Sequence, residues 1–529
     1  MHFLRNIFLS AGATAAAAAA MAAPAAVCNA PIAAASTAGA LVVGNGTAAS
    51  CTGPALQAAI NAASVVTFNC GAAPATIALY ATLEVPATRA TVIDGGGRIT
   101  LDGGNRVRLI EVVNPNFRTN RVGLTLQHLT LAGGKASGTR YVAPDPSNAS
   151  CAYGWADGAG GAIYVRDASL HVIDVVFHAN AAASPGPDVG GGAIYAAASL
   201  DVAIVGSTFD GNSASNGGAV GLLQSDGRFA NDLFSGNRAS GSGENFVGGA
   251  AAGCAGVAQA NQGGAGGNGG AIAIDGGADG AQTVCGSVFA SNTANELGGA
   301  LFRTADGAAQ PTTFDRSRFQ GNHAHSGGAL YVQNAKPLAI TASTFDANVA
   351  VSAGAARLVA DTPQITNTTF AGNTATLGLG GALMLSGASA AGWINNTTFS
   401  GNLSSGGSGY FSAAIGGTLP MPVTNTVFAN NLSKDAGSPM QCFFTPGSGS
   451  ADVQWPTRRP VGGLQDNACV TGIRFVDPQL GALASNGGPT PTLAPAAASP
   501  LRKAGQGCAA TDQRGIARNT AACTIGAVE

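Results

Sequence analysis

Acidic and basic side chains that could act on a polysaccharide occur singly along this 529-residue sequence. Hydrolysis of a glycosidic bond requires two carboxyl groups at a defined separation, and no two aspartates are adjacent. A β-elimination requires a base, and Lys135, Arg140 and His128 carry suitable side chains. Because only proximity in sequence unites these three, we expect them to be solvated turn residues.

Three Asp-Gly-Gly segments, which begin at Asp94, Asp102 and Asp275, have residues in common with calcium-binding loops. Aspartate before glycine also caps a turn through its own side chain, and we favour that interpretation. The sequence therefore predicts no cofactor and no metal site, and Ca²⁺ would take part only if the protein were a lyase.

The elements that would position any site come from a repeat. The motif Phe-x-x-Asn recurs with successive phenylalanines 25 to 32 residues apart, except for one interval of 55. This spacing predicts an array in which each repeat is one supersecondary unit. The nine copies are Phe177/Asn180, Phe209/Asn212, Phe234/Asn237, Phe289/Asn292, Phe319/Asn322, Phe345/Asn348, Phe370/Asn373, Phe399/Asn402 and Phe428/Asn431.

A second motif, Gly-Gly-Ala followed by Ile, Val or Leu, alternates with the first. Apolar residues within a unit have the period of a β-strand, as in Leu170/Val172 and Leu338/Ile340. A unit of two or three short strands cannot bury its apolar side alone, so we expect coils that stack with parallel pairing. The sequence predicts an all-β, single-stranded parallel β-helix of about a dozen coils over residues 90–440.

Stacking explains both motifs. Each motif phenylalanine would lie above the next inside the solenoid, and each motif asparagine would bond its amide to the asparagines above and below it. Glycines at the corners would supply positive φ and close backbone approach. At the usual spacing between strands, the rod would be roughly 50 to 60 Å long.

A possible ligand-binding strip follows from strand alternation. The residue after each Gly-Gly-Ala-aliphatic motif should point outward, and four of these seven residues are aromatic: Tyr164, Tyr195, Phe302 and Tyr331. Such a strip suits sugar rings or a partner protein. The alternative is that the rings only stack on one another or lie beneath a loop such as residues 135–158 or 241–268.

The amino terminus predicts export. Residues 1–25 combine Arg5, an apolar stretch and a small-residue cleavage site at Ala23–Ala25, which is typical of a secretory signal peptide. The mature chain would begin at Ala26, and lipidation of Cys28 is a second possibility. The 25 basic and 27 acidic residues balance, which argues against a nucleic-acid partner. We expect a monomer with no transmembrane segment in the mature chain.

Ten cysteines in an exported chain favour disulfides. Pairing of sequence neighbours is our working hypothesis, and it leaves Cys28 and Cys151 over. The four pairs would be Cys51–Cys70, Cys254–Cys285, Cys442–Cys469 and Cys508–Cys523.

The two motifs together resemble the repeats of polymorphic outer-membrane proteins, within the pectate-lyase-like right-handed β-helix superfamily. Residues 26–89, including Cys51-Thr52, Val66–Gly71 and Ile93–Gly97 just beyond, look like the amino-terminal cap and first coils of secreted bacterial β-helix proteins. By this resemblance, Ala55–Ala63 is a short helix that closes one end of the rod.

Residues 441–529 resemble a choice-of-anchor Q-type domain through Asp477-Pro478, Asn486–Thr490, Thr511–Gly515 and Cys523–Ala527. Arg502-Lys503 stands where that family tends to have an aspartate, and residues 440–529 lack the long alternating strands of a translocator barrel. The resemblance implies a bacterial protein that is secreted, at the cell surface or in the periplasm.

Two functions agree with these features. The first is a non-catalytic adhesin or structural rod that binds glycans or protein partners, because polygalacturonase-like and pectate-lyase-like catalytic motifs do not occur in the sequence. The alternative is a polysaccharide lyase or glycoside hydrolase of the same superfamily, whose site would be brought together by coil stacking.

Overall fold

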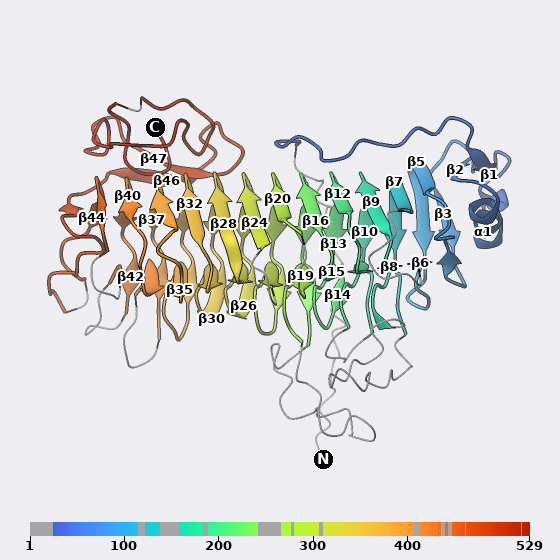
Figure 1. Cartoon of the computed structure of the whole chain (residues 1–529), viewed down its shortest axis with the longest axis horizontal. Coiled ribbons are helices and arrows are strands. Elements are labelled where there is room, and N and C mark those ends of the chain that lie inside the picture. Colours follow the sequence, from blue (N-terminus) through green and yellow to red (C-terminus); the bar gives the residue numbers. More distant parts are fainter. Residues whose placement is uncertain are drawn as a thin grey trace, which may run out of the picture.

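The computed structural model is an all-β solenoid, drawn as a long rod in Figure 1. Its strands pair in parallel from coil to coil, which confirms the predicted parallel β-solenoid. The structure describes residues 25–114, 122–137, 158–183, 189–241, 266–276, 280–305, 310–406, 412–434, 440–442, 447–460, 462–519 and 521–529. The predicted signal peptide lies outside these residues, apart from Ala25.

Three stacked sheets form the walls of the rod. A complete coil gives two strands to the first sheet, one to the third and one to the second. The second sheet has 11 strands: β4 (Leu83–Glu84), β6 (Ile110–Val113), β8 (Ile163–Arg166), β11 (Ile194–Ala197), β15 (Val220–Leu223), β19 (Ile272–Asp275), β23 (Leu301–Thr304), β27 (Leu330–Gln333), β31 (Ala356–Val359), β35 (Leu383–Ser386) and β39 (Ile415–Gly417).

The third sheet has eight short strands that follow the motif asparagines. They are β14 (Ser213–Ala214), β18 (Arg238–Ala239), β22 (Thr293–Ala294), β26 (His323–Ser326), β30 (Val349–Ser352), β34 (Thr374–Ala375), β38 (Leu403–Ser404) and β42 (Leu432–Ser433).

The first sheet has 26 strands and bends sharply within each coil. Its strands are β1 (Leu41–Val43), β2 (Val65–Phe68), β3 (Ala75–Ala78), β5 (Thr91–Asp102), β7 (Gly123–Ala132), β9 (Ser169–Ile173), β10 (Val176–His178), β12 (Val202–Val205), β13 (Thr208–Asp210), β16 (Gly227–Ala230), β17 (Leu233–Ser235), β20 (Gln282–Cys285), β21 (Val288–Ala290), β24 (Gln310–Asp315), β25 (Arg318–Gln320), β28 (Ala335–Thr341), β29 (Thr344–Asp346), β32 (Pro363–Thr366), β33 (Thr369–Ala371), β36 (Trp393–Asn395), β37 (Thr398–Ser400), β40 (Val423–Thr424), β41 (Val427–Ala429), β43 (Gly449–Ser450), β44 (Val453–Trp455) and β45 (Arg474–Phe475).

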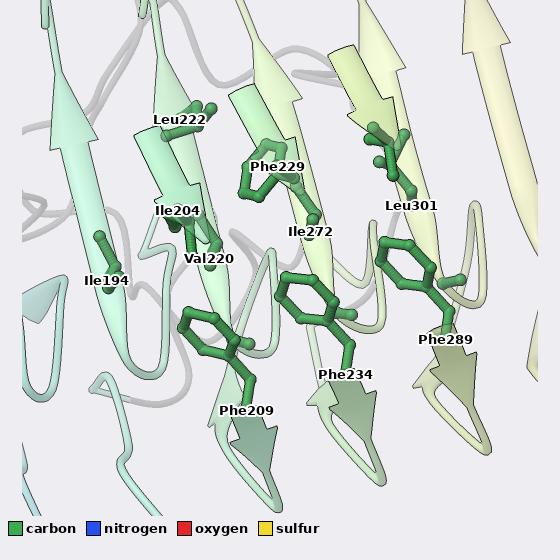
Figure 2. Close-up of a cluster of buried hydrophobic side chains, with 14 of the residues drawn as sticks. Ile194, Ile204, Phe209, Val220, Leu222, Phe229, Phe234, Ile272, Phe289 and Leu301 are labelled. Carbon is green, nitrogen blue, oxygen red and sulfur yellow. The ribbon is translucent and has the colours of Figure 1, made fainter. Parts of the chain in front are cut away.

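The nine motif phenylalanines form one interior column, from Phe177 to Phe428. Neighbouring rings are stacked with centroids 4.5 to 5.4 Å apart. Figure 2 shows Phe209, Phe234 and Phe289 in this column, with aliphatic residues of the second sheet such as Val220 nearby. All nine rings are fully buried, so the sheets close around a continuous apolar core.

The nine motif asparagines form the predicted ladder beside that column. Each of the first eight donates an amide hydrogen to Oδ1 of the next asparagine at 2.7 to 3.0 Å. The second amide hydrogen goes to a backbone carbonyl, as from Asn373 to Phe345. No member is exposed, and the ladder thereby satisfies buried polar groups that would otherwise destabilise the fold.

A second interior ladder was not predicted. It consists of the residue two positions before each motif phenylalanine. Ser207, for example, accepts from the backbone N–H of Val175, and its own N–H donates to the buried carboxylate of Asp232. The signal was visible in the sequence, because Ser, Thr or Asp precedes eight of the nine motif phenylalanines at this spacing.

The two ends of the rod are closed by different means. Helix α1 (Gly53–Ala62), expected at residues 55–63, buries Leu56 and Ile60 against the first coils and begins at Thr52, whose hydroxyl caps Ala55. At the other end, stacked strands continue past residue 440 to β45. There Gln454 takes the place of the motif phenylalanine and bonds its amide to Asp466, so the column ends in a polar plug.

Three of the four predicted disulfides are present, namely Cys51–Cys70, Cys442–Cys469 and Cys508–Cys523. The predicted Cys254–Cys285 bond is wrong, because Cys285 pairs with Cys28 across 257 residues. Pairing by sequence proximity failed here because the amino-terminal segment folds back along the rod. The thiol of Cys28 is thus unavailable for lipidation, and Cys151 and Cys254 lie outside the described residues.

After β45 the chain turns back over the first sheet and forms the antiparallel hairpin of β46 (Leu480–Ala484) and β47 (Thr492–Pro495). We call residues 476–529 the C-terminal segment, drawn in red above the rod in Figure 1. Residues 25–40, the N-terminal arm, run along the same side of the rod. In the part of the chain that the structure describes, no helix is long and apolar enough to cross a membrane.

Candidate functional site

The bend in the first sheet places one residue per coil at an outer edge of the rod. In ten successive coils this residue has φ between 45° and 64°, the left-handed region that residues other than glycine rarely adopt. We call these residues the corner column: His128, Asp174, Gly206, Asn231, Gly286, Arg316, Ala342, Asn367, Asn396 and Asn425.

The N-terminal arm docks on the first part of this column. The side-chain oxygen of Asn231 accepts from the backbone N–H groups of Val27 and Cys28 at 2.8 and 2.9 Å, and its amide donates to the carbonyl of Cys28. Further along the arm, Gln127 exchanges two hydrogen bonds with the backbone of Ala35. The arm is therefore held through its backbone.

The disulfide joins the arm covalently to the strand that precedes Gly286. A β-carbon at Gly286 would lie 2.5 Å from the Asn231 side-chain oxygen and 3.1 Å from the Cys28 sulfur. Both distances are shorter than normal contacts, and the positive φ also disfavours a side chain here. Glycine at this coil thus makes room for the arm.

The C-terminal segment docks on the last three positions of the same column. Asn425 exchanges two hydrogen bonds with the backbone of Gln506, and Asn396 accepts from the N–H of Ala509 at 3.0 Å. Asn367 donates to the carbonyl of Thr511 at 2.8 Å. In these bonds the asparagine side chains pair with backbone N–H and C=O groups of the segment. The corner column therefore binds an extended segment without depending on the segment's side chains.

The Thr511–Gly515 motif is the core of this attachment. Gln513 is buried and bonds to the hydroxyls of Thr344 and Thr369 on the outer face of the first sheet. Asp512, also buried, pairs with Arg514 at 2.7 Å and accepts the N–H of Ile516. The Thr511–Gly515 motif thus has a structural role, because it attaches the C-terminal segment to the rod.

A cavity of about 360 Å³ lies between the two docked segments. We call it the seam cavity. Val27 lines it from the arm, Asp315 and Arg316 from the rod, and residues 511–515 from the C-terminal segment. Arg316 bonds to Asp315 at 2.8 Å and to the Val27 carbonyl at 3.2 Å, so it connects the rod, the arm and the cavity.

Ionisable groups on the outer face of the first sheet are engaged with one another. Asp201 bonds to His171 at 3.0 Å and to Arg228, whose guanidinium also contacts the arm at Pro31. Burial raises the pKa of Asp201, but the bonds from His171 and Arg228 outweigh it and lower the pKa below its usual value. The same holds for Asp94, where burial is outweighed by Gln127, Gly96 and His128.

A shallow groove of about 270 Å³ crosses β7, β10, β13 and β17 in the early coils. Its floor is largely apolar and includes Val176 and Leu233, while His178 and Asp210, 3.0 Å apart, form a polar part of its lining. Val176 is 37% exposed. We call this the early groove. The hydrogen bonds that hold the arm and the C-terminal segment are made by other residues of the rod, such as Asn231 and Asn425.

The four aromatic residues of the predicted strip lie in one column of the second sheet, with Gly221 and Ala273 between the two pairs. Tyr164 stacks on Tyr195 at 6.0 Å and Phe302 on Tyr331 at 5.7 Å. Tyr164, Tyr195 and Phe302 are at most 5% exposed, and only Tyr331 is half-buried. Burial raises the pKa of Tyr164 to about 12. Ligand binding by the strip stays a prediction.

The residues considered for a β-elimination are not gathered into a site. Lys135 is exposed and pairs through its backbone with Ala181 below the third sheet, whereas His128 stands on the corner column and bonds to Asp94. Arg140 lies outside the described residues.

The Asp-Gly-Gly segments act as turns where the structure describes them. Asp94 accepts the N–H of Gly96 and Asp102 accepts that of Gly104, both at 2.8 Å. The third segment, which begins at Asp275, includes Gly277, which lies outside the described residues.

Comparison with known proteins assigns no family to this chain. No family model matches the chain, and no curated protein matches its sequence. Among solved structures, PfbA, a surface adhesin of Streptococcus pneumoniae, is 12% identical with a TM-score of 0.31, and the match covers 76% of this chain and 82% of that one. A family 28 exopolygalacturonase of Yersinia enterocolitica is 13% identical with a TM-score of 0.33, over 73% and 74%. At these scores we base no argument on either likeness.

Proposed function

We propose that the protein is an exported, non-catalytic β-helix rod that binds an extended glycan at the cell surface or in the extracellular space. The observation that carries the proposal is the early groove, which neither terminal segment covers. The corner of the first sheet binds the terminal segments, and acids on the outer face of this sheet, such as Asp201, are paired with histidine and arginine side chains. The early groove is left as a surface for a ligand.

The chemistry of the early groove suits a sugar chain. Val176 and Leu233 contribute to an apolar floor that suits ring faces, and the exposed side chains of His178 and Asp210 are polar groups beside it. The groove crosses four coils, so at about 4.8 Å per coil it extends roughly 14 Å along the rod. An extended chain of two or three sugars would lie along it.

Export is supported by the disulfides. Four bonds between described cysteines, one of which closes a loop of 257 residues, are stable in oxidising compartments. In the same proposal, the repeats are of the polymorphic outer-membrane protein type and residues 476–529 correspond to a choice-of-anchor domain. The docking of Thr511–Gly515 on the rod supports a role for this segment in holding the rod together.

The test is a screen of the mature protein, residues 26–529, against acidic and neutral polysaccharides with and without Ca²⁺. Retention on a glycan and new reducing or unsaturated ends are followed together. The proposal predicts retention without product. Product release would show an enzyme, and absence of retention on every glycan would contradict glycan binding and favour a protein partner.

Variants then locate the binding surface. Val176→Asp places a charge on the apolar floor of the early groove and should weaken retention at least tenfold. Leu377→Asp, at a residue that is 60% exposed and distant from the groove lining, is the matched control and should leave retention unchanged. Tyr331→Ala tests the aromatic strip. Loss of retention in Tyr331→Ala with retention intact in Val176→Asp would move the site to the second sheet.

A further inference from the structure

The seam cavity lies where the N-terminal arm reaches the C-terminal segment, and this position goes beyond the proposed glycan binding. The arm follows the rod through backbone hydrogen bonds at Ala35 and Cys28, and it comes to the cavity at Val27. From Val27 the chain is held on two sides. Its N–H donates to Asn231 at 2.8 Å and its carbonyl accepts from Arg316 at 3.2 Å.

The residue before Val27 is therefore one position away from a residue that lines the cavity. Ala26 is exposed, and it is the residue at which the predicted signal-peptide cleavage would create a new amino terminus. A free α-ammonium at Ala26 would be attracted to a carboxylate within reach of this position.

Two carboxylates line the cavity, and only one has capacity for such a partner. Asp512 is fully buried and already accepts from Arg514, Ile516 and Glu529. Asp315 keeps about a quarter of its side chain exposed and bonds to Arg316 through Oδ2. Its Oδ1 faces no hydrogen-bond donor that the structure records among the described residues.

We propose that the seam cavity is the binding site of the mature amino terminus, with the Ala26 α-ammonium paired to the Asp315 carboxylate. Arg316 positions both groups, because it bonds to Asp315 and to the carbonyl of the next residue, Val27. Removal of the signal peptide would then create the α-ammonium group whose ion pair with Asp315 holds the end of the arm beside the C-terminal segment.

The reactivity of the α-amino group tests this proposal. The amino terminus of the secreted protein is first identified by mass spectrometry, and the rate at which an activated ester acylates it is measured at pH 7. Only the neutral amine reacts, and its ordinary pKa is about 7.7 to 8.0. Pairing that raises this pKa by about one unit should slow acylation about tenfold relative to the unfolded chain.

Asp315→Asn should restore fast acylation, because it removes the negative charge and keeps the shape of the side chain. Asp346→Asn is the matched control. Asp346 lies on the next coil, pairs with Arg318 and does not line the cavity, so acylation should stay slow. A mature chain extended by Gly-Gly before Ala26 moves the amine by up to about 7 Å and should also react fast, which keeps the test valid if Asp315→Asn does not fold.

Three results would overturn the proposal. They are an amino terminus at a residue other than Ala26, acylation in the native protein as fast as in the unfolded chain, and acylation that stays slow in both Asp315→Asn and the Gly-Gly extension. Since glycan retention is measured separately, failure here leaves the proposed function standing.

Discussion

The phenylalanine column and the corner column share the same coil repeat but differ in what is conserved along the rod. Inside, the residue type is constant, because each phenylalanine contacts the phenylalanine of the next coil. At the corner only the backbone conformation is constant, and the side chains include His, Asp, Gly, Asn, Arg and Ala. Corner residues meet different segments, namely the arm at Asn231 and the C-terminal segment at Asn396.

The difference shows how single coils of a repeat protein can bind unique segments while the interior stays regular. A coil that contacts its own copy is constrained to repeat its sequence. A coil that contacts a unique segment is constrained only in shape, so its residue can change. Substitutions at the two columns should accordingly affect different properties, namely the stability of the rod and the attachment of the terminal segments.

The largest effect is expected inside the rod. Phe319→Ala removes a fully buried ring that stacks on Phe289 and Phe345, and the cavity should lower the free energy of unfolding by about 3 to 5 kcal/mol. Gln320→Ala, on the same strand β25 but exposed, is the control and should change it by less than about 0.5 kcal/mol. Denaturant unfolding measures both, and equal effects would contradict an interior column.

The asparagine ladder should give the next largest effect. Asn322→Ala and Asn373→Ala each leave neighbouring buried amides unpaired, and we expect a loss of about 1 to 3 kcal/mol. Asn295→Ala provides the comparison, because Asn295 bonds to carbonyls at an exposed position. An unchanged melting midpoint in Asn373→Ala would mean that the ladder does not contribute to stability.

The stability of the fold should depend on pH through Asp452, which lies at the end of the second interior ladder. Burial raises the pKa of Asp452 to about 8, so between pH 4 and pH 8 the folded state holds this proton more tightly than the unfolded state. Stability from this group is therefore greatest at low pH and falls as the pH rises towards 8. Asp452→Asn should reduce the loss of melting temperature between pH 6 and pH 9, and an unchanged loss would contradict the assignment.

The smallest effects should occur at the corner and have opposite signs. At Gly206 a β-carbon would lie 2.4 Å from the Asp174 carboxylate, and φ is +62°, so Gly206→Ala should destabilise the protein by about 1 to 2 kcal/mol. Ala342 already has φ of 49°, and Ala342→Gly should stabilise by up to about 1 kcal/mol. Two losses of similar size would contradict the constant left-handed corner.

Features that recur in every coil could be predicted from the sequence, whereas contacts that occur only once could not. Phe-x-x-Asn at a spacing of 25 to 32 residues predicted the coil, the column and the ladder, because identical contacts require identical residues. The Ser/Thr/Asp ladder was missed although its signal was present, since three small polar residue types share one role. The Cys28–Cys285 bond was missed because it depends on where the arm runs, and nothing local to either cysteine encodes that path.

The candidate binding surfaces were also hard to predict, because they depend on contacts that occur only once along the rod. The aromatic residue at Tyr164 was identified correctly as a repeated position, but its burial depends on residues that contact it from outside the repeat, such as Ala159 and Arg108. The early groove has no motif, because it is a stretch of the first sheet that the terminal segments do not cover.

Hydrogen exchange on single-site variants tests the central claim most directly, namely that one corner column holds both terminal segments. Asn231→Gly and Asn396→Gly keep the left-handed backbone and remove one docking amide each. The account predicts faster exchange in residues 27–35 for the first variant, faster exchange in residues 506–511 for the second, and unchanged protection in β25 and β29. Exchange in the terminal segments that is already fast in the parent protein, or that neither variant changes, would contradict it.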